Sequence, residues 1–299
     1  MTNDVEEVSI VNNNLNSNIA KKVSDVGIPR LLNLYSKYDV EGTFYFTGTF
    51  AKNHAESVQS VIDHGHEVGC HGFSHYQHHS FDVLDYSNQL IHLTRAKKYI
   101  EEISGKIEAF RAPALRIGNN TPILLQKLGF KTDSSVASRR FDGPLTSGGL
   151  RKLNWLLSPR FPYQMSLKNP YKKGSSSILE IPVSSYIAGY QGTTMRISPR
   201  LNEIIGNKLY NESVKNSNPV VFLFHPTELV KEKIYNLDIR RSTSKLSSIF
   251  SDRLRRKLKL SNLGNKSGKL LEEVLKNSKS RGFDFISAKT YRKKHKSYN

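Results

Sequence analysis

Acidic residues and histidines with metal-ligand spacing stand in two short stretches of the sequence. Asp4 and Glu6 are two positions apart in a stretch typical of a strand, so both carboxylates face the same way, with Cα atoms about 7 Å apart. His71 and His75 have the H-x3-H spacing with which two imidazoles can reach one ion from a helical turn. Two histidines and one carboxylate make a three-ligand site with open positions, which is what a hydrolytic metal needs.

Two more polar side chains follow apolar stretches. Arg111 stands directly after a predicted strand, and beside Asp4 it would orient that carboxylate and keep it ionised. His225 ends the apolar run VVFLF, and a histidine at the tip of a buried strand is a candidate acid or base. A plainer structural interpretation stays open for each group: a solvated acid pair, chance histidine spacing, a structural ion pair and a structural histidine.

The elements that must position these groups alternate between strands and helices, which predicts a mostly parallel sheet, either a barrel or doubly wound. In a β/α barrel the chemistry lies at the C-terminal ends of the strands. Residues 136–177 are typical of a long loop, and residues 229–265 are polar and weakly patterned. We expect strands at 2–10, 42–48, 67–70, 107–110, 130–133, 178–183, 220–224 and 283–287, and helices at 28–38, 51–63, 83–102, 121–128 and 269–280.

Composition indicates one globular domain. The chain has 299 residues, of which 37% are hydrophobic, enough to bury a full core. Its single cysteine, Cys70, excludes an internal disulfide and a cysteine-based metal cluster. No apolar run approaches the roughly 18 residues of a membrane span, and the start MTNDVEE lacks the pattern of a secretory signal. We therefore expect a cytoplasmic protein.

Positive charge is concentrated toward the C-terminus. The net charge is +19, and residues 229–299 contain 20 Lys and Arg against 6 Asp and Glu, a net of +14. A basic segment can dock on an anionic membrane surface, which would place the protein at the inner membrane face, or it can be a solvated tail. Nucleic acid is not expected, because no aromatic platform or nucleic-acid motif accompanies the charge. The basic clusters are Arg253, Arg255, Arg256, Lys257 and Lys259, and Arg292, Lys293, Lys294 and Lys296.

The stretches GTFYFTG, GHEVGCHGFSH, FRAPA and LFHP occur in the order found in the polysaccharide deacetylase family, which shares the NodB homology domain of carbohydrate esterase family 4. The chain resembles the branch with an Asp-x-Glu/Asp first motif, and the resemblance runs from Asp4 to the stretch GFDFISAKTY. It implies an α/β fold, an irregular (β/α)7-type barrel, with a domain at residues 1–290 and a basic tail at 291–299.

The resemblance also implies roles for individual residues. Three features depart from the family pattern. Glu6 is longer than the usual aspartate, and Val5 stands where many relatives place a metal-binding acid. Ala114 stands where an aromatic residue usually follows the proline, and the fourth motif, usually an aspartate and a tryptophan, is not clear. The implied roles are catalytic base for Asp4, acid for His225, base-positioning arginine for Arg111, metal ligands for Glu6, His71 and His75, acyl-methyl pocket for Leu223, oxyanion contact for the backbone N–H near Ala114, and orientation of His225 for Asp133.

The implied reaction is hydrolysis of an N-acyl group, first of all N-acetyl, on an amino sugar, a glycan or a lipid-linked sugar. Water activated by one divalent metal would attack the amide; zinc is the first choice, with cobalt, manganese or iron as alternatives. Three other interpretations remain: a hydrolase of a small linear or cyclic amide on the same scaffold, a non-haem iron oxygenase, and a non-catalytic binder of anionic partners through the basic C-terminus. The sequence does not specify the sugar or the oligomeric state.

Overall fold

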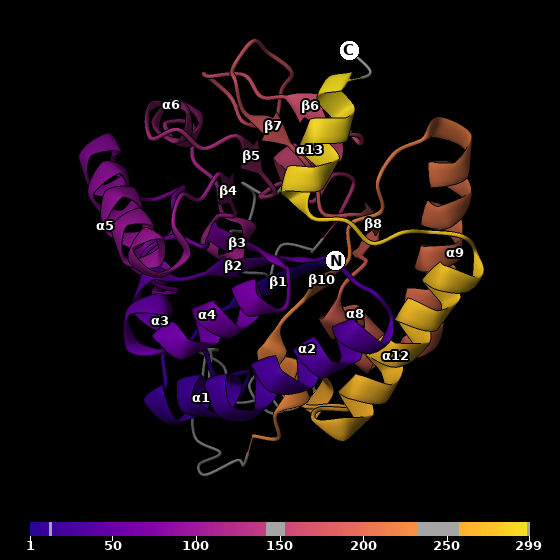
Figure 1. Cartoon of the computed structure of the whole chain (residues 1–299). Coiled ribbons are helices and arrows are strands. Elements are labelled where there is room, and N and C mark those ends of the chain that lie inside the picture. Colours follow the sequence, from indigo (N-terminus) through magenta and orange to yellow (C-terminus); the bar gives the residue numbers. More distant parts are fainter. Residues whose placement is uncertain (12–13, 142–152, 233–256, 298–299) are drawn as a thin grey trace, which may run out of the picture.

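A curled, eight-stranded sheet forms the centre of the protein (Figure 1). The computed structural model describes residues 1–11, 14–141, 153–232 and 257–297. In the order β10-β1-β2-β3-β4-β5-β7-β6, all neighbours from β10 to β7 are parallel, and β6 is antiparallel to β7. The predicted NodB-like β/α barrel is therefore confirmed. The strands are β1 (Thr2–Val5), β2 (Thr43–Phe46), β3 (Glu67–Cys70), β4 (Ala109–Phe110), β5 (Thr132–Asp133), β6 (Tyr163–Gln164), β7 (Leu179–Glu180) and β10 (Leu223–Phe224), with a separate hairpin of β8 (Ser185–Tyr186) and β9 (Ala188–Gly189).

Helices surround the curled sheet on its outer face (Figure 1). Most of these helices connect one strand of the sheet to the next, because parallel strands require a crossover connection. The helices are α1 (Ser17–Lys22), α2 (Ile28–Lys37), α3 (Gly48–Asn53), α4 (Ala55–Asp63), α5 (Tyr86–Ser104), α6 (Thr121–Lys127), α7 (Asn154–Leu157), α8 (Gly192–Ile197), α9 (Pro199–Asn216), α12 (Asn265–Ser280) and α13 (Ala288–Ser297). There are also a π-helical turn, η1 (Val23–Gly27), and a 3₁₀ turn, η5 (Pro226–Leu229).

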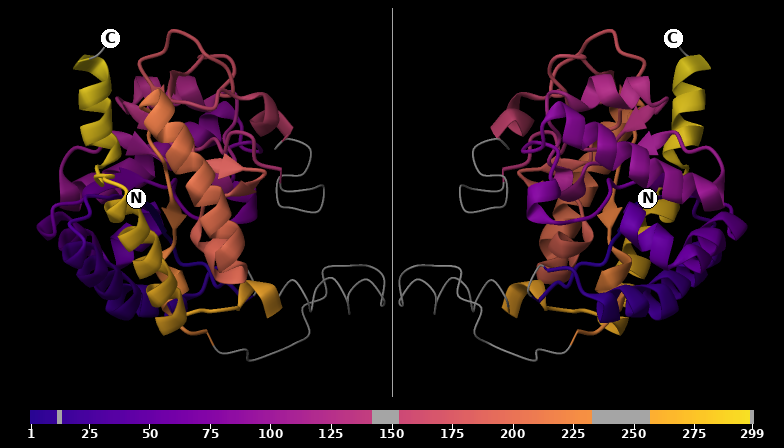
Figure 2. Two further views of the ribbon diagram at one scale, coloured as in Figure 1. Left: turned by 90° about the vertical axis from the view of Figure 1, so that its right-hand side faces the viewer. Right: turned by 90° about the vertical axis from the view of Figure 1, so that its left-hand side faces the viewer.

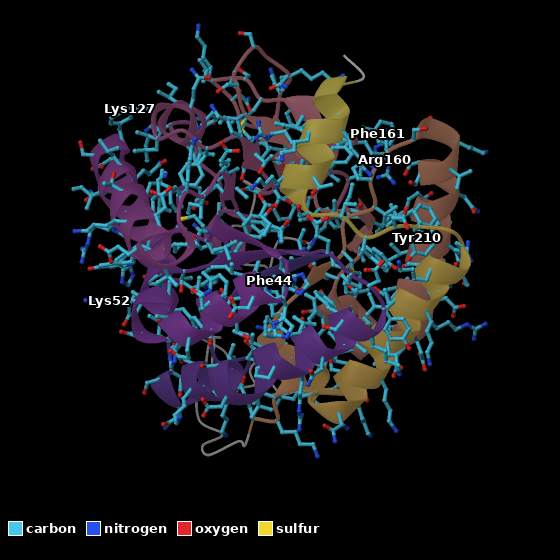
Figure 3. The ribbon with its side chains drawn as sticks, in the orientation of Figure 1. Phe44, Lys52, Lys127, Arg160, Phe161 and Tyr210 are labelled. Atoms are coloured by element: carbon cyan, nitrogen blue, oxygen red, sulfur yellow. The ribbon has the colours of Figure 1, made fainter. Side chains whose placement is uncertain are left out.

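Local sequence explains the best-defined elements. Strand β2 has the sequence TFYF and is buried at every position, as expected of a strand covered on both faces. Helix α2 buries Ile28, Leu31, Leu32 and Tyr35, which recur at helical spacing along one face. Phe44 of β2 lies in the interior against Tyr35, with ring centroids 6.0 Å apart, whereas Lys52 and Lys127 extend outward (Figure 3).

Several expected elements differ from those observed. The strand expected at 2–10 ends at Val5, after which the chain leaves the sheet toward the site. The helix expected at 51–63 is two helices, because His54 has a non-helical conformation with φ −138° and ψ 55°. Within 136–177, expected to be a loop, the described part includes α7 and β6. Helices α8 and α9 were not expected, and much of the weakly patterned segment, residues 233–256, lies outside the described residues.

The strand expected at 283–287 is wrong. Phe285 makes only an isolated bridge to Val40, and the chain then enters α13. This segment crosses the N-terminal ends of the strands: the Ala288 N–H donates to Thr43 Oγ1 at 2.9 Å, and Arg292 pairs with Glu108 at 2.6 Å.

The described part of the basic tail is largely helical, because α13 extends to residue 297. Figure 2 shows α13 on one side of the barrel and α7 on the opposite side. The division into a domain at 1–290 and a tail at 291–299 stays a prediction. Of the basic clusters, Arg253, Arg255 and Arg256 lie outside the described residues, as does the side chain of Lys296. Among the helices that the structure describes, none combines the length and hydrophobicity needed to span a membrane.

Candidate active site

Three candidate metal ligands meet at the C-terminal ends of β1 and β3. Glu6 follows β1 directly, His71 follows β3 directly, and His75 lies four residues farther along the same loop. Their ligand atoms all lie within 4.8 Å of one another. Glu6 Oε2 is 3.6 Å from His71 Nε2 and 3.1 Å from His75 Nε2. The parallel sheet thus brings together residues that are up to 69 positions apart in sequence.

The donor atoms fit a divalent cation. Glu6 Oε2 and His71 Nε2 are buried, and neither finds a hydrogen-bond partner among the described residues. Leaving two such atoms unpaired is costly unless something binds them both. One carboxylate and two imidazoles form the three-ligand set of a catalytic zinc site, and nitrogen and oxygen donors also suit other transition metals. Glu6, His71 and His75 are therefore the residues that could bind a metal.

The two histidines are oriented by the backbone. His71 Nδ1 lies 2.9 Å from the Arg111 carbonyl oxygen, so Nδ1 carries the proton and the lone pair of Nε2 is left for a metal ion. The Ala114 N–H donates to His75 Nε2 at 3.1 Å, so this N–H points at the site. Residues 71–76 are not helical, so the expectation that both imidazoles project from a helical turn is wrong. Gly72, with φ +70°, turns the loop so that both rings reach the same point.

Arg111 fixes Asp4 at the edge of the metal site. Its NH1 donates to Asp4 Oδ1 at 2.8 Å, and the other carboxylate oxygen, Oδ2, lies 3.7 Å from His71 Nε2. The guanidinium is fully buried; it also donates to Ser134 O at 2.8 Å, to Ser134 Oγ at 2.6 Å and to Thr2 Oγ1 at 3.1 Å. Asp4 is thus placed beside the ligands by a rigid partner.

The pKa shifts of Asp4, Glu6 and His75 suit one base and two metal ligands. Burial would raise the pKa of the Asp4 carboxyl, but the Arg111 charge brings this pKa below its usual range. Burial would also raise the pKa of Glu6, but His75 and His71 lower it to about 2. Burial lowers the pKa of His75, which favours the neutral, metal-binding imidazole. Both carboxylates are therefore ionised at neutral pH.

His225 lies on the other side of Asp4 and is oriented by Glu228. His225 Nε2 is 3.9 Å from Asp4 Oδ2, and its Nδ1 is 3.3 Å from Glu228 Oε1. Glu228 is itself buried and pairs with Arg196. Burial alone would lower the pKa of His225, but the hydrogen bond to Glu228 and the charges of Asp4 and Glu6 raise it to about 9. His225 is therefore protonated at neutral pH, as an acid must be.

Asp133 was expected to orient His225, and this expectation is corrected by the structure. The Asp133 carboxylate accepts from Ser135 Oγ at 2.5 Å and from the Ser134 N–H at 2.9 Å, and Ser135 Oγ in turn accepts from the Ala112 N–H at 2.8 Å. Asp133 therefore supports the loop that carries Arg111 and Ala114. The acid that contacts His225 comes instead from the turn that follows β10.

Asp133 faces a second buried acid. Glu180 stands opposite Asp133 in the register of β5 and β7, and both side chains are fully buried. Burial raises the pKa of Asp133 to about 6 and the pKa of Glu180 well above its usual value. The two carboxyls therefore share a proton at neutral pH, because two buried like charges at one site cannot both ionise.

An apolar wall stands next to the polar groups. Leu223 and Leu115 are buried in a small cluster with Trp155, which is separate from the main core. Leu115 follows Ala114, and Leu223 is two residues before His225, so the cluster lies beside the residues that flank the metal ligands. Ala114 and Leu115 both have positive φ, 53° and 56°, a strained conformation that is concentrated at functional sites.

Two site residues were missed from the sequence. Glu228 stands three residues after His225, and an H-x-x-E pair on one helical turn was the signal that could have found it. Trp155 is the only tryptophan of the chain, but it stands in a stretch without a periodic pattern.

Part of the chain is similar to known proteins. Residues 23–132 match the family model for polysaccharide deacetylases. Over these residues the chain is similar to polysaccharide deacetylases. It is 30% identical over 168 residues to the peptidoglycan deacetylase of Helicobacter pylori, and the alignment covers 54% of this chain and 54% of that protein. The match therefore spans about half the length of this curated relative.

Solved structures show the same fold. A protein of Mycobacterium smegmatis assigned to the polysaccharide deacetylases superposes with a TM-score of 0.57 at 23% identity, covering 76% of each chain. Another from Pseudomonas aeruginosa gives a TM-score of 0.50 at 16% identity, covering 76% of this chain and 77% of the other. At these identities the likeness shows the fold alone.

Proposed function

We propose that this protein is a metal-dependent hydrolase that removes the N-acetyl group from an amino sugar or glycan. The observation that carries the proposal is the position of Asp4 Oδ2, 3.7 Å from the candidate ligand His71 and 3.9 Å from the protonated His225. A base and an acid thus flank a three-ligand site, and amide hydrolysis needs all three functions. The family match and the similarity to a peptidoglycan deacetylase support an N-acetylated sugar as substrate.

Each residue contributes one part of the proposed reaction. A divalent ion bound by Glu6, His71 and His75 would supply positive charge beside the amide carbonyl and activate water. Asp4, ionised by its contact with Arg111, accepts the proton of the attacking water. The Ala114 N–H donates to His75 Nε2 in the structure; once that nitrogen binds the ion, the N–H would be released to donate a hydrogen bond to the carbonyl oxygen as negative charge develops there.

His225 acts last in this scheme. Its Nε2 proton passes to the amine nitrogen as the C–N bond breaks, which gives a free amino sugar and acetate. Leu223 and its apolar neighbours would line the pocket for the acetyl methyl group. Zinc remains the first choice of metal, and the cytoplasmic location also stays a proposal.

Metal content and acetate release test this function together. The purified protein is expected to contain about one divalent ion per chain and to release acetate from N-acetylglucosamine oligomers. The double variant His71→Ala/His75→Ala should lose both properties, whereas His64→Ala, which changes an exposed histidine away from the site, should keep both. Bound metal without acetate release would favour a small linear or cyclic amide as substrate. Full activity in the double variant would refute the site.

A further inference from the structure

A cavity lies at the end of the barrel opposite the metal ligands. Its volume is about 280 Å³, and its walls come from the start of β1, the segment before β10, helices α9 and α12, and residues 283–288. Residues 283–288 cross the N-terminal ends of the strands, where the Ala288 N–H donates to Thr43 Oγ1 at 2.9 Å. The proposed metal ligands, base and acid do not line this cavity, so it is separate from the proposed active site.

The cavity adjoins the buried guanidinium that holds Asp4. Thr2 and Ser134 both line the cavity, and their hydroxyl oxygens accept from Arg111 NH2 at 3.1 and 2.6 Å. The ring of Tyr45, which also lines the cavity, lies against the same guanidinium, with its centroid 4.5 Å from Arg111 Cζ. A molecule in the cavity would therefore contact three neighbours of Arg111.

The Tyr45 hydroxyl has no hydrogen-bond partner among the described residues, although the side chain is fully buried. Tyr45 stands opposite Asp4 in the register of β1 and β2, so both side chains point into the barrel. Burial raises the pKa of Tyr45 above its usual value, so the hydroxyl keeps its proton and can donate a hydrogen bond. Because an unpaired buried hydroxyl is costly, we expect its partner to lie in the cavity.

The other buried polar side chains of the cavity have partners. Tyr210, from α9, points toward α12 (Figure 3), where its hydroxyl lies 2.7 Å from Ser278 Oγ, and it also lies 2.5 Å from the hydroxyl of Tyr190. Most of the rest of the wall is aromatic or aliphatic. In the described part of the chain, the exposed Asp284 is the only charged side chain that lines the cavity. The wall therefore suits an uncharged, largely apolar molecule with one polar atom placed for Tyr45.

We propose that this cavity binds a small uncharged molecule whose oxygen accepts a hydrogen bond from Tyr45 and whose apolar body fills the remaining space. An apolar cavity of about 150 Å³ already holds benzene, so this larger one can hold an aromatic ring that carries a carbonyl group. A charged ligand is disfavoured, because its charge would be buried without a counter-charge. The inference does not depend on the proposed deacetylase activity, since the cavity shares no residue with the metal site.

Binding of two probes of the same shape tests the site. Acetophenone has a carbonyl oxygen where α-methylstyrene has a CH₂ group, and ligand-observed NMR would measure both dissociation constants. Tyr45→Phe should weaken the binding of acetophenone about fivefold, the effect of one hydrogen bond, and leave that of α-methylstyrene unchanged. Val274→Phe, which fills the cavity from α12, should abolish the binding of both probes. A wild-type protein that binds neither probe, or an equal change for both in Tyr45→Phe, would overturn the proposal.

Tyr35→Phe is the matched control. Tyr35 is as fully buried as Tyr45, but it lies outside the cavity, and its hydroxyl donates to Asn3 Oδ1 at 2.8 Å. This variant should bind both probes as the wild-type protein does, but without probe its midpoint of thermal unfolding should fall, because Asn3 loses its partner. Tyr45→Phe removes a hydroxyl without a protein partner, so its midpoint should not fall. A fall in Tyr45→Phe as large as that in Tyr35→Phe would show that bound water satisfies the hydroxyl, and would overturn the proposal.

Discussion

Glu228 Oε1 lies 3.3 Å from His225 Nδ1, and both residues belong to one short turn at the end of β10. Glu228 also pairs with the buried Arg196, which keeps the pKa of the Glu228 carboxyl low although burial would raise it. The proposed acid is therefore oriented and kept protonated by a carboxylate that is always ionised near neutral pH. The turn that carries His225 and Glu228 is therefore expected to determine the pH at which the acid loses its proton.

Replacing Glu228 should change the alkaline side of the pH profile. His225, with a pKa of about 9, keeps its proton up to that pH, so activity that depends on the acid is lost as the pH rises through 9. Glu228→Gln removes the negative charge, so the pKa of His225 falls and the alkaline limb of kcat/KM moves to lower pH. The control Glu232→Gln changes an acid that binds Ser9 instead and should leave the limb in place. An unchanged limb in Glu228→Gln would show that another group sets it.

Asp4→Asn should separate catalysis from metal binding. The amide oxygen can still accept from Arg111, but the side chain can no longer take a proton, so kcat should fall by about 10² to 10⁴. Metal content, measured by elemental analysis, should stay near that of the wild-type protein, because Glu6, His71 and His75 are unchanged. Loss of metal in this variant would mean that Asp4 is itself a ligand.

Arg111→Met should destabilise the fold strongly. It leaves Asp4 as an uncompensated buried charge, so the free energy of unfolding should fall by about 3–5 kcal/mol. Adding Asp4→Asn to that variant removes the charge and should restore part of the loss. Lys37→Met, which breaks an exposed pair with Glu272, should reduce the free energy of unfolding much less. Urea unfolding measures all four proteins, and a small loss in Arg111→Met would show that Asp4 is solvated after all.

The acid pair Asp133 and Glu180 should make stability fall as the pH rises. The unfolded chain releases both protons near pH 4, whereas the folded pair, with the pKa of Asp133 raised to about 6 and that of Glu180 raised well above its usual value, keeps both protons to higher pH. Between pH 4 and the pKa values of the folded pair, the native state binds more protons than the unfolded chain. The free energy of unfolding therefore decreases as the pH rises, by up to about 1.4 kcal/mol per pH unit for each additional bound proton.

Glu180→Gln removes the shared proton and tests whether the pair makes stability fall as the pH rises. The free energy of unfolding of the variant minus that of the wild-type protein should be larger at pH 7 than at pH 4.5, as measured by urea unfolding at both values. Glu203→Gln, an exposed acid on α9, should show a difference that does not vary with pH. A Glu180→Gln difference that is also independent of pH would mean that both carboxyls ionise freely in the folded state.

The meeting of distant motifs could be predicted because each follows a strand. Asp4, His71, Arg111 and His225 all lie at or just after strands β1, β3, β4 and β10, and parallel strands end at one edge of the sheet. The strand order itself, with β10 beside β1, depends on contacts between residues about 220 positions apart, which local patterns do not encode.

The missed features have local physical reasons. His71 and His75 were expected on a helix, but Gly72 adopts a positive φ and allows an irregular loop to bring the rings together. Glu228 escaped notice because a four-residue 3₁₀ turn is too short to show periodicity. The strand expected at 283–287 has a strand-like pattern, but its backbone meets only Val40.

The pairing of β10 with β1 also determines when the site can form. As the chain is synthesised, the strand that carries Asp4 can pair with β2 early, but its other edge lacks a neighbour until Leu223 and Phe224 have left the ribosome. Pairing over so many residues is slow because a long loop must close first. Asp4 and Glu6 therefore gain His225 as a neighbour only late in folding, and an unfinished chain cannot carry out chemistry that needs all three.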